Sequence, residues 1–309
     1  MRLRSVFPLV LLLLAACGPR PLPPGRQPVS ASATLAATQT PAPPSPIPFP
    51  TATRRPACLT QPGRIERAEV EHPGLTRTLP YRLYVPACAG EPGFERMPVL
   101  YLLHGLTYDD SQWERLGVPA AADELIAAGQ APPFLVVMPW ERSGLDLEVA
   151  ITQALLPEVE ARFPSAGGRQ SRAIGGLSRG AGWALRIGLK HPELFGAIGL
   201  HSPAVLSPDL FYLADWAEAI PARDTPRLAL DIGEKDPLRP KALELAAALN
   251  DLGLTVALTP NPGQHTESYW AEHVAEYLAW YVQPWQATAA ARGTATPSPR
   301  ELGVCPCAE

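Results

Sequence analysis

Apolar and polar residues alternate along two segments, residues 64–72 and 77–85, and the Pro73-Gly74 pair lies between them. A period of two residues places every second side chain on one face, which is typical of a half-buried β-strand. Because Pro and Gly favour a turn, the two segments are predicted to pair as an antiparallel hairpin.

Further along the chain, short apolar runs alternate with longer segments of helical character. The apolar runs lack a polar face, as expected for strands that helices cover on both sides. We expect strands at residues 98–103, 134–138, 171–176, 195–200, 227–232 and 254–258, and helices at residues 118–128, 147–163, 180–190, 241–252 and 268–281. Pro157 lies inside the second of these helices and is expected to kink or restart it.

A hairpin followed by alternating strands and helices predicts an α/β protein with a doubly wound, mostly parallel sheet and an antiparallel edge. The chain has 309 residues, of which 46% are hydrophobic, so it can bury one full core. Its net charge of −4 gives no electrostatic basis for binding nucleic acid. Residues 199–227 leave room for only a short excursion, so no large lid is expected.

The N-terminus has the pattern of an export signal, a basic start followed by a short apolar run that ends at Cys17. The run is shorter than the roughly 20 apolar residues that span a bilayer. Leu14-Ala15-Ala16-Cys17 resembles the lipobox of bacterial lipoproteins, in which the cysteine receives a diacylglyceryl group. We therefore expect residues 1–17 to be a lipoprotein signal peptide with Cys17 as the lipidation site. The protein would be exported, either anchored to the cell membrane or extracellular or periplasmic.

Residues 18–60 are rich in Pro, Ala, Ser and Thr and are expected to form a disordered spacer. The catalytic domain is expected to cover residues 61–285, and a flexible tail residues 286–309.

Four cysteines remain if Cys17 is lipidated, and an exported protein lies where disulfides persist. Cys58 and Cys88 are almost equally far from the hairpin turn, so antiparallel pairing would place them side by side, within reach of a disulfide. The sequence leaves the pairing of Cys305 and Cys307 open. No Cys or His partners lie near that pair in the sequence, so we expect no metal site there.

The segment Gly176-Leu177-Ser178-Arg179-Gly180 has the pattern Gly-x-Ser-x-Gly. An expected strand precedes it and an expected helix follows it, which is the context of a nucleophile elbow. The two glycines leave room for the sharp turn. The Ser178 hydroxyl would then lie at the positive end of a helix, where a developing oxyanion is stabilised.

A serine hydroxyl is a weak nucleophile and needs a base. Of the six histidines, only His265 gives the order Ser, acid, His that this arrangement uses, and His201 at a strand end is its main rival. Asp236 is predicted to be the acid, because it lies in the loop beyond the penultimate strand. Asp231 is still within that strand, and Glu234 is the other competitor. The acid would hold the imidazole tautomer and stabilise the imidazolium.

Two backbone N–H groups, those of Leu106 and Arg179, are predicted to form the oxyanion hole. Trp113, Trp140 and Trp270 fit either the mouth of the site or the core. At the mouth they would suit an aromatic or sugar ester better than a long lipid chain.

Four segments together resemble the putative esterase family of α/β hydrolases. They are Pro98-Val-Leu-Tyr-Leu-Leu-His-Gly-Leu with Trp113 downstream, Gly-Leu-Ser-Arg-Gly, Gly-Glu-Lys-Asp-Pro-Leu, and Gly-Gln-His with Trp270. That family includes esterase D, feruloyl, acetylxylan and enterochelin esterases and the mycobacterial mycolyltransferases. The resemblance covers roughly residues 64–281 and implies serine acyl chemistry on Ser178, Asp236 and His265, with Leu106 and Arg179 as oxyanion donors. Trp140-Glu141 departs from it, because many relatives carry a small polar residue there, and this leaves the substrate contacts open.

We therefore expect a serine carboxylesterase that hydrolyses short-chain, aromatic or sugar esters without a cofactor or metal. Its partners would be a small-molecule ester and, through the anchor, a membrane. Two alternatives stay open: an acyltransferase of the mycolyltransferase type, and a non-catalytic binding module on the same fold. The lack of a large lid favours hydrolysis, because water would reach the acyl-enzyme. The sequence does not reveal the acyl group, the alcohol or the oligomeric state.

Overall fold

The computed structural model describes residues 55–163 and 166–293. The predicted signal peptide with Cys17, most of the predicted spacer, and Cys305 and Cys307 lie outside these residues.

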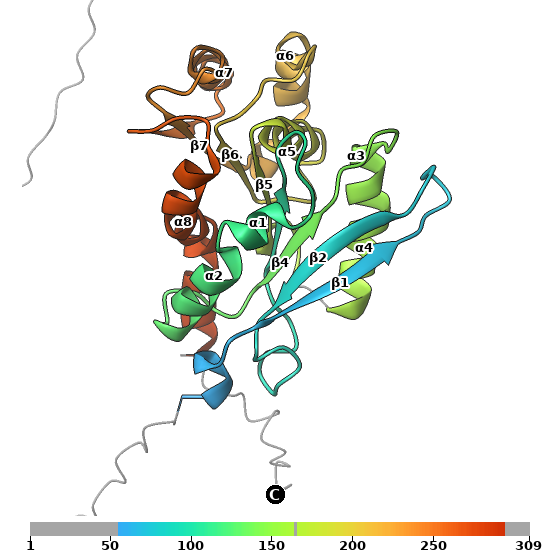
Figure 1. Ribbon diagram of the computed structural model, residues 1–309, viewed down its shortest axis with the longest axis vertical. Coiled ribbons are helices and arrows are strands. Elements are labelled where there is room, and N and C mark those ends of the chain that lie inside the picture. Colours follow the sequence, from blue (N-terminus) through green and yellow to red (C-terminus); the bar gives the residue numbers. More distant parts are fainter. Residues whose placement is uncertain (1–54, 164–165, 294–309) are drawn as a thin grey trace, which may run out of the picture. The chain divides into compact units, whose positions relative to one another are not determined.

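The described residues form a mixed sheet whose strands follow the order β1-β2-β4-β3-β5-β6-β7-β8 (Figure 1). The β1–β2 and β2–β4 pairs are antiparallel and all the others are parallel. The predicted α/β-hydrolase architecture, a mostly parallel sheet with an antiparallel hairpin at one edge, is therefore confirmed. The strands are β1 (Arg64–Val70), β2 (Leu79–Val85), β3 (Val99–Leu103), β4 (Leu135–Pro139), β5 (Arg172–Leu177), β6 (Ala197–His201), β7 (Arg227–Gly233) and β8 (Val256–Asn261).

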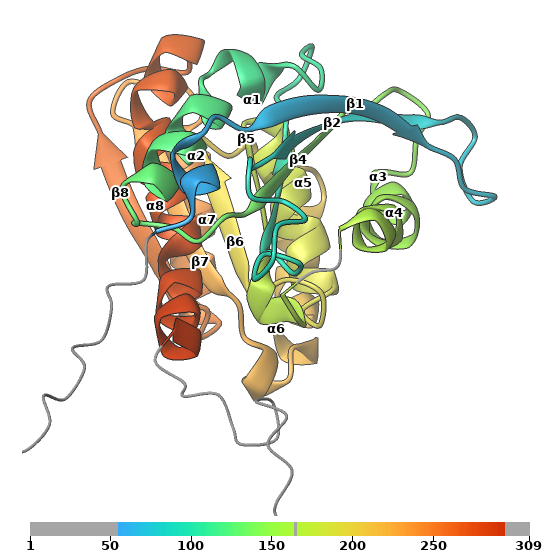
Figure 2. The ribbon, with the colours of Figure 1, turned by 90° about the horizontal axis from the view of Figure 1, so that it is seen from below.

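Helices cover both faces of this sheet, as the apolar strands require (Figure 2). One face packs against α1, α2 and α8, and the other against α3, α4, α5, α6 and α7. The helices are α1 (Gln112–Arg115), α2 (Val118–Ala127), α3 (Leu147–Val149), α4 (Leu156–Arg162), α5 (Arg179–Lys190), α6 (Asp209–Ala219), α7 (Arg239–Asp251) and α8 (Glu267–Gly293).

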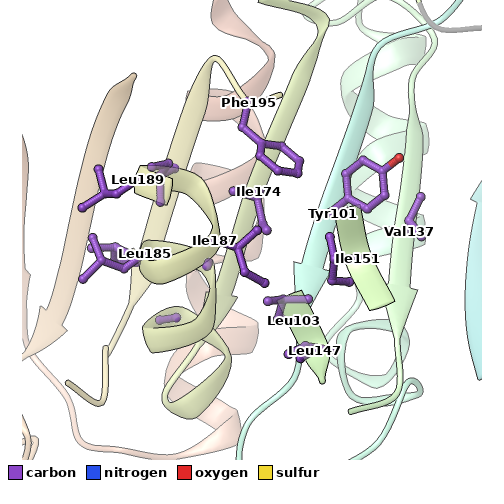
Figure 3. Close-up of a cluster of buried hydrophobic side chains, with 14 of the residues drawn as sticks. Tyr101, Leu103, Val137, Leu147, Ile151, Ile174, Leu185, Ile187, Leu189 and Phe195 are labelled. Atoms are coloured by element: carbon purple, nitrogen blue, oxygen red, sulfur yellow. The ribbon is translucent and has the colours of Figure 1, made fainter. Parts of the chain in front are cut away.

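Strand β3 illustrates how an apolar run serves both layers. Tyr101 and Leu103 point into the core under α5, where they lie near Ile174 and Ile187 (Figure 3), and the intervening Leu102 belongs to the opposite core. All five residues of β3 are buried. Such a strand needs apolar side chains at every position, which explains the absence of alternation in the sequence.

The helix expected at residues 147–163 is divided into three parts. Helix α3 is followed by a π-helical segment, Ala150–Leu155, and then by α4, which has Pro157 in its first turn. A proline lacks the N–H that a helix interior needs, whereas the first turn needs none. The backbone stays helical through Leu155 and Leu156, so the irregularity expected near Pro157 takes the form of the π-helical segment that precedes α4.

The sequence patterns missed α1 and α6, and α8 continues through Gly293. The last helix therefore passes the expected end at residue 281 and enters the segment predicted as a tail, residues 286–309. None of the described helices is long and apolar enough to cross a membrane.

The N-terminal end of the domain is tied down by a disulfide and an arginine. The predicted Cys58–Cys88 disulfide is confirmed, with a Cα–Cα distance of 5.0 Å. Arg55 donates hydrogen bonds to the carbonyl groups of Ile126 and Ala127, each at 2.7 Å. A short 3-10 helix, Ala57–Thr60, contains Cys58, so the folded domain begins before the predicted boundary at residue 61.

The buried Tyr281 of α8 occupies space that two strand glycines leave open. Gly175 in β5 pairs with Gly199 in β6, and a Cβ on either would lie 1.8 Å from the Tyr281 hydroxyl oxygen. This hydroxyl also lies 3.0 Å from Nε2 of His201. The two glycines therefore let α8 pack directly against the sheet backbone.

We predict that Gly175→Ala lowers the free energy of unfolding by about 1–3 kcal/mol, because the new methyl overlaps the Tyr281 ring. Adding Tyr281→Phe should recover part of this loss, since the closest overlapping atom is removed. Denaturant unfolding of both single variants and the double variant measures the coupling. Strictly additive losses would contradict the close contact.

Candidate active site

The topology creates a crevice between β3 and β5. The chain runs from β3 to β4 on one side of β3 and then returns to β5 on the other side. At such a switch point the loops that follow the two parallel strands diverge, which leaves room for a ligand at the strands' carboxyl ends. His104 follows β3 at this place and Ser178 follows β5.

Ser178 occupies a strained turn between β5 and α5, with φ 54° and ψ −119°. The turn is sharp because two backbones pass in contact. A Cβ on Gly180 would lie 2.3 Å from the carbonyl oxygen of Leu103, and one on Gly176 would lie 2.5 Å from the carbonyl carbon of Gly180. The glycines of the motif are thus required by close approach, as the nucleophile-elbow interpretation assumes.

The structure brings Ser178, His265 and Asp236 together in one hydrogen-bonded row. Nε2 of His265 lies 2.9 Å from Oγ of Ser178, and Nδ1 of His265 lies 2.8 Å from Oδ2 of Asp236. The Asp236 side chain is fully buried, and His265 is partly exposed. This is the geometry of a nucleophile, a base and an orienting acid.

Two backbone hydrogen bonds join the loops that carry the acid and the base. The N–H of Glu234 donates to the carbonyl of Asn261 at 2.8 Å, and that of Lys235 donates to Gly263 at 2.9 Å. Both loops follow neighbouring parallel strands, β7 and β8. Residues far apart in the sequence therefore meet in a fixed register.

The Asp236 carboxylate is held in its ionised form. Burial alone would raise its pKa, but hydrogen bonds from His265 and from the Leu238 N–H outweigh burial, and the pKa lies below its ordinary value. The Leu238 N–H donates to Oδ1 at 2.8 Å. Both carboxylate oxygens thus have donors, which fixes the side chain for orienting His265.

The two predicted oxyanion donors lie on either side of the crevice. Arg179 begins α5, and the first N–H groups of a helix have no partner within it. Leu106 lies in the turn after β3, which the Tyr108 N–H closes by donating to Gly105 O at 3.2 Å. A Cβ on Gly105 would lie 3.7 Å from Cβ of Ser178, so this turn runs beside the nucleophile.

Gln112 and His104 fix that turn from both sides. The buried Gln112 accepts a hydrogen bond from the Gly105 N–H at 2.8 Å. Nδ1 of His104 donates to the carbonyl of Gly105 at 2.7 Å, and Nε2 accepts from the Glu141 N–H at 2.9 Å. Burial lowers the pKa of His104, which agrees with this neutral, one-donor, one-acceptor arrangement.

Glu141 links the turn after β4 to α5. Its carboxylate accepts hydrogen bonds from Nε of Arg179 at 3.0 Å and from the indole N–H of Trp183 at 3.1 Å. Sequence patterns identified neither Gln112 nor Glu141 as part of the site. The signal for Glu141 was its place directly after Pro139-Trp140, where the chain departs from the family pattern.

His201, the rival base, belongs to a different cluster. Its Nδ1 lies 2.6 Å from Asp231, and its ring stacks on Tyr277 with centroids 3.7 Å apart. Asp231 also accepts hydrogen bonds from the hydroxyls of Tyr269 and Tyr277, at 2.9 and 2.8 Å. Both His201 and Asp231 are buried behind the site. Glu234, the remaining rival acid, is exposed.

Two of the three tryptophans that fit either the mouth or the core are buried. Trp113 is 1% exposed and its indole N–H donates to Leu103 O at 3.0 Å. Trp270 is 3% exposed and donates to Oγ of Ser202 at 3.1 Å. Trp113 and Trp270 are therefore core residues, because each buried N–H has found a partner. Trp270 packs edge-on against His265, with ring centroids 4.9 Å apart.

Trp140 is partly exposed and lines an open pocket of about 490 Å³, which we call the Trp140 pocket. Its walls come from the loops after β3 and β4 and from the start of α5, and include Leu106, Trp140, Glu141, Arg142, Arg179 and Trp183. Because Leu106 and Arg179 belong to it, the pocket adjoins the predicted oxyanion hole. No group of three or more His, Cys, Asp or Glu residues that could hold a metal ion occurs among the described residues.

Comparisons with known proteins agree with this fold. A curated Xylanibacter ruminicola protein, an endo-1,4-beta-xylanase/feruloyl esterase, is 32% identical over 128 residues, which are 37% of this chain and 18% of that protein. The chain thus spans less than a fifth of the length of the curated relative it matches.

Solved structures match a larger part of the chain. A ferulic acid esterase superposes with a TM-score of 0.63 and 22% identity, over 72% of this chain and 98% of that chain. An S-formylglutathione hydrolase from Staphylococcus aureus gives a TM-score of 0.59 and 19% identity, over 72% and 98%. At these identities the likeness establishes a shared fold.

A family model described as "putative esterase" matches residues 74–283, more than half of the chain and all of the elements that carry the candidate site. The chain therefore belongs to the putative esterase family of α/β hydrolases.

Proposed function

We propose that this protein is a serine carboxylesterase with Ser178 as nucleophile, His265 as base and Asp236 as orienting acid. The observation that carries the proposal is the continuous hydrogen-bonded row, 2.9 Å from Ser178 to His265 and 2.8 Å from His265 to Asp236. Membership of an esterase family supports the same chemistry. A non-catalytic binding module would have no need of this alignment.

The reaction follows from the geometry in two steps. As Oγ of Ser178 attacks the ester carbonyl carbon, Nε2 of His265 takes the hydroxyl proton, and Asp236 stabilises the imidazolium. The backbone N–H groups of Leu106 and Arg179 stabilise the oxyanion. The alcohol leaves with the proton from His265, and an acyl-enzyme remains. A water molecule, deprotonated by His265, then releases the acid and restores Ser178.

Hydrolysis is favoured over transfer to an alcohol. The Trp140 pocket is open, so water reaches the acyl-enzyme, whereas a transferase must exclude water and hold an acceptor. The relatives' names, feruloyl esterase and S-formylglutathione hydrolase, also describe hydrolytic reactions. We infer esters with short or aromatic acyl groups as substrates, because the partly exposed Trp140 offers a flat apolar wall.

We also infer that the enzyme acts outside the cytoplasm. The Cys58–Cys88 disulfide fits an oxidising compartment. Anchoring through a lipid on Cys17 would place the domain in front of a membrane, and mass spectrometry of the mature N-terminus tests for that lipid.

Ser178→Ala is expected to lower kcat for a chromogenic aryl ester by about four to six orders of magnitude, because the nucleophile is lost. The variant should retain the wild-type circular dichroism spectrum and unfolding midpoint. Wild-type activity on every ester tested would overturn the proposed mechanism.

His265→Ala should abolish burst-phase acylation, whereas His201→Ala should retain the burst and lose stability instead. The reason is that only His265 contacts Oγ of Ser178, while His201 bonds to Asp231 in the interior. Stopped-flow release of nitrophenol separates the two roles. The assignment fails if His201→Ala loses the burst and His265→Ala keeps it.

Partitioning of the acyl group tests hydrolysis against transfer. With an aryl ester and excess glycerol or trehalose, most of the acyl group should appear as free acid, because no wall of the pocket excludes water. Chromatography of the products measures the ratio. A majority of acylated alcohol would replace the esterase proposal with an acyltransferase.

A further inference from the structure

We propose that the Trp140 pocket receives an acyl group that carries a carboxylate, so that the preferred substrates are esters of dicarboxylic acids or of similar anionic acids. This inference rests on the proposed esterase function and adds the charge of the substrate to it.

The charges that line the pocket do not cancel. Glu141, Arg142 and Arg179 are the charged residues among its walls, since His104 is neutral. Glu141 is bound by Arg179, and Nε of Arg179 lies 3.0 and 3.1 Å from its two carboxylate oxygens. That pair is electrically balanced, and it leaves the guanidinium of Arg142 as the uncompensated charge.

Arg142 has no carboxylate within salt-bridge distance among the described residues. Its guanidinium lies 4.9 Å from the centre of the Trp140 ring, and one of its NH2 groups is 3.3 Å from the carbonyl oxygen of Thr78. Nε of Arg142 is buried and lacks a hydrogen-bond partner. A guanidinium that lies over an indole and has no carboxylate partner can accept a planar anion through its remaining NH2 donors.

The acids near the pocket are either paired with other arginines or separated from Arg142. The Glu69 carboxylate accepts a hydrogen bond from the Thr78 hydroxyl at 2.6 Å, and this hydroxyl in turn lies 3.5 Å from an NH2 group of Arg142, so Glu69 reaches the guanidinium only through Thr78. Asp109 lies 3.8 Å from Arg115, and Asp110 lies 3.3 Å from Arg82. None of these three acids forms a salt bridge with Arg142, so its guanidinium is the cation available to an anion in the pocket.

The acyl half of the ester is the half that faces this pocket. The leaving oxygen must lie next to Nε2 of His265 to receive its proton. The walls of the pocket come from the loops after β3 and β4 and from α5, and none comes from the loops that carry Asp236 or His265. The pocket thus lies on the side of the oxyanion donors, away from the leaving alcohol.

Matched pairs of esters test the charge preference. The first pair is 4-nitrophenyl hydrogen adipate and its neutral methyl ester, which differ in the charge and in one methyl group at the far end of the acyl half. The second pair is 4-acetoxybenzoate and its methyl ester, which carry the charge on the alcohol half. The measurement is the ratio of kcat/KM, anionic over neutral, for each pair at neutral pH and low salt.

The wild-type enzyme should favour the anionic adipate by about tenfold, the effect of one charge-assisted contact. Arg142→Gln should remove this preference, and Arg142→Lys should keep part of it. Glu141→Gln should increase the preference, because it leaves Arg179 uncompensated. General damage to the site would not lower the preference in Arg142→Gln and raise it in Glu141→Gln, whereas a charge effect would. Added salt should weaken the preference.

Arg67→Gln is the matched control, since Arg67 is an exposed residue of β1 and its loss changes the net charge equally. It should leave the ratio unchanged. The inference is overturned if the wild type has no anionic preference, if Arg142→Gln and Arg67→Gln act alike, or if the acetoxybenzoate pair alone depends on Arg142. Failure of the esterase proposal itself is distinct, because then neither neutral ester would be cleaved in a Ser178-dependent way.

Discussion

No side chain fits between the first turn of α5 and the end of β3, and the active site depends on that contact. The carbonyl of Leu103 would be 2.3 Å from a Cβ on Gly180, so the helix begins in van der Waals contact with the neighbouring strand. Ser178 lies at this turn with a positive φ of 54°, a strained conformation for a non-glycine residue that costs on the order of 1–3 kcal/mol. Burial of α5 against the sheet offsets that strain. The same contact brings the N-terminus of α5 beside the turn after β3, and these are the two segments that carry the predicted oxyanion donors.

Two histidine–carboxylate pairs lie near the carboxyl ends of the strands and have different roles. The inner pair is His201 with Asp231, and the outer pair is His265 with Asp236. In the inner pair, Asp231 bonds to His201 and to the hydroxyls of Tyr269 and Tyr277. A buried carboxylate is tolerated only with several donors. Burial, together with the charge of Asp231, raises the pKa of both tyrosines, so they stay protonated and donate. The inner pair thus fixes α8 on the sheet, and α8 in turn places Trp270 against the outer pair's His265.

Much of the architecture follows from the sequence because strand and helix periods are local properties. The order of the elements, the hairpin and the elbow required only short patterns and close spacing. The positions of Trp113 and Trp270 could not be predicted from such patterns, because an indole suits a core and a pocket wall equally well. Which one it occupies depends on whether a buried acceptor, here Leu103 O or Ser202 Oγ, meets its N–H. Such acceptors belong to other segments, so no local pattern reveals them.

Arg179 directly follows the nucleophile, and its positive charge is balanced by Glu141. A free guanidinium beside the oxyanion hole would attract anions from solvent into the space that the ester carbonyl must occupy. Pairing with Glu141 removes that charge locally and directs the Arg179 side chain along the pocket wall, while its backbone N–H stays at the start of α5. The Glu141 N–H also donates to His104, whose ring bonds to the Gly105 carbonyl in the turn that carries Leu106. Glu141 thereby bonds to groups next to both predicted oxyanion donors, and replacing it by a small polar residue would remove the partner of the Arg179 side chain.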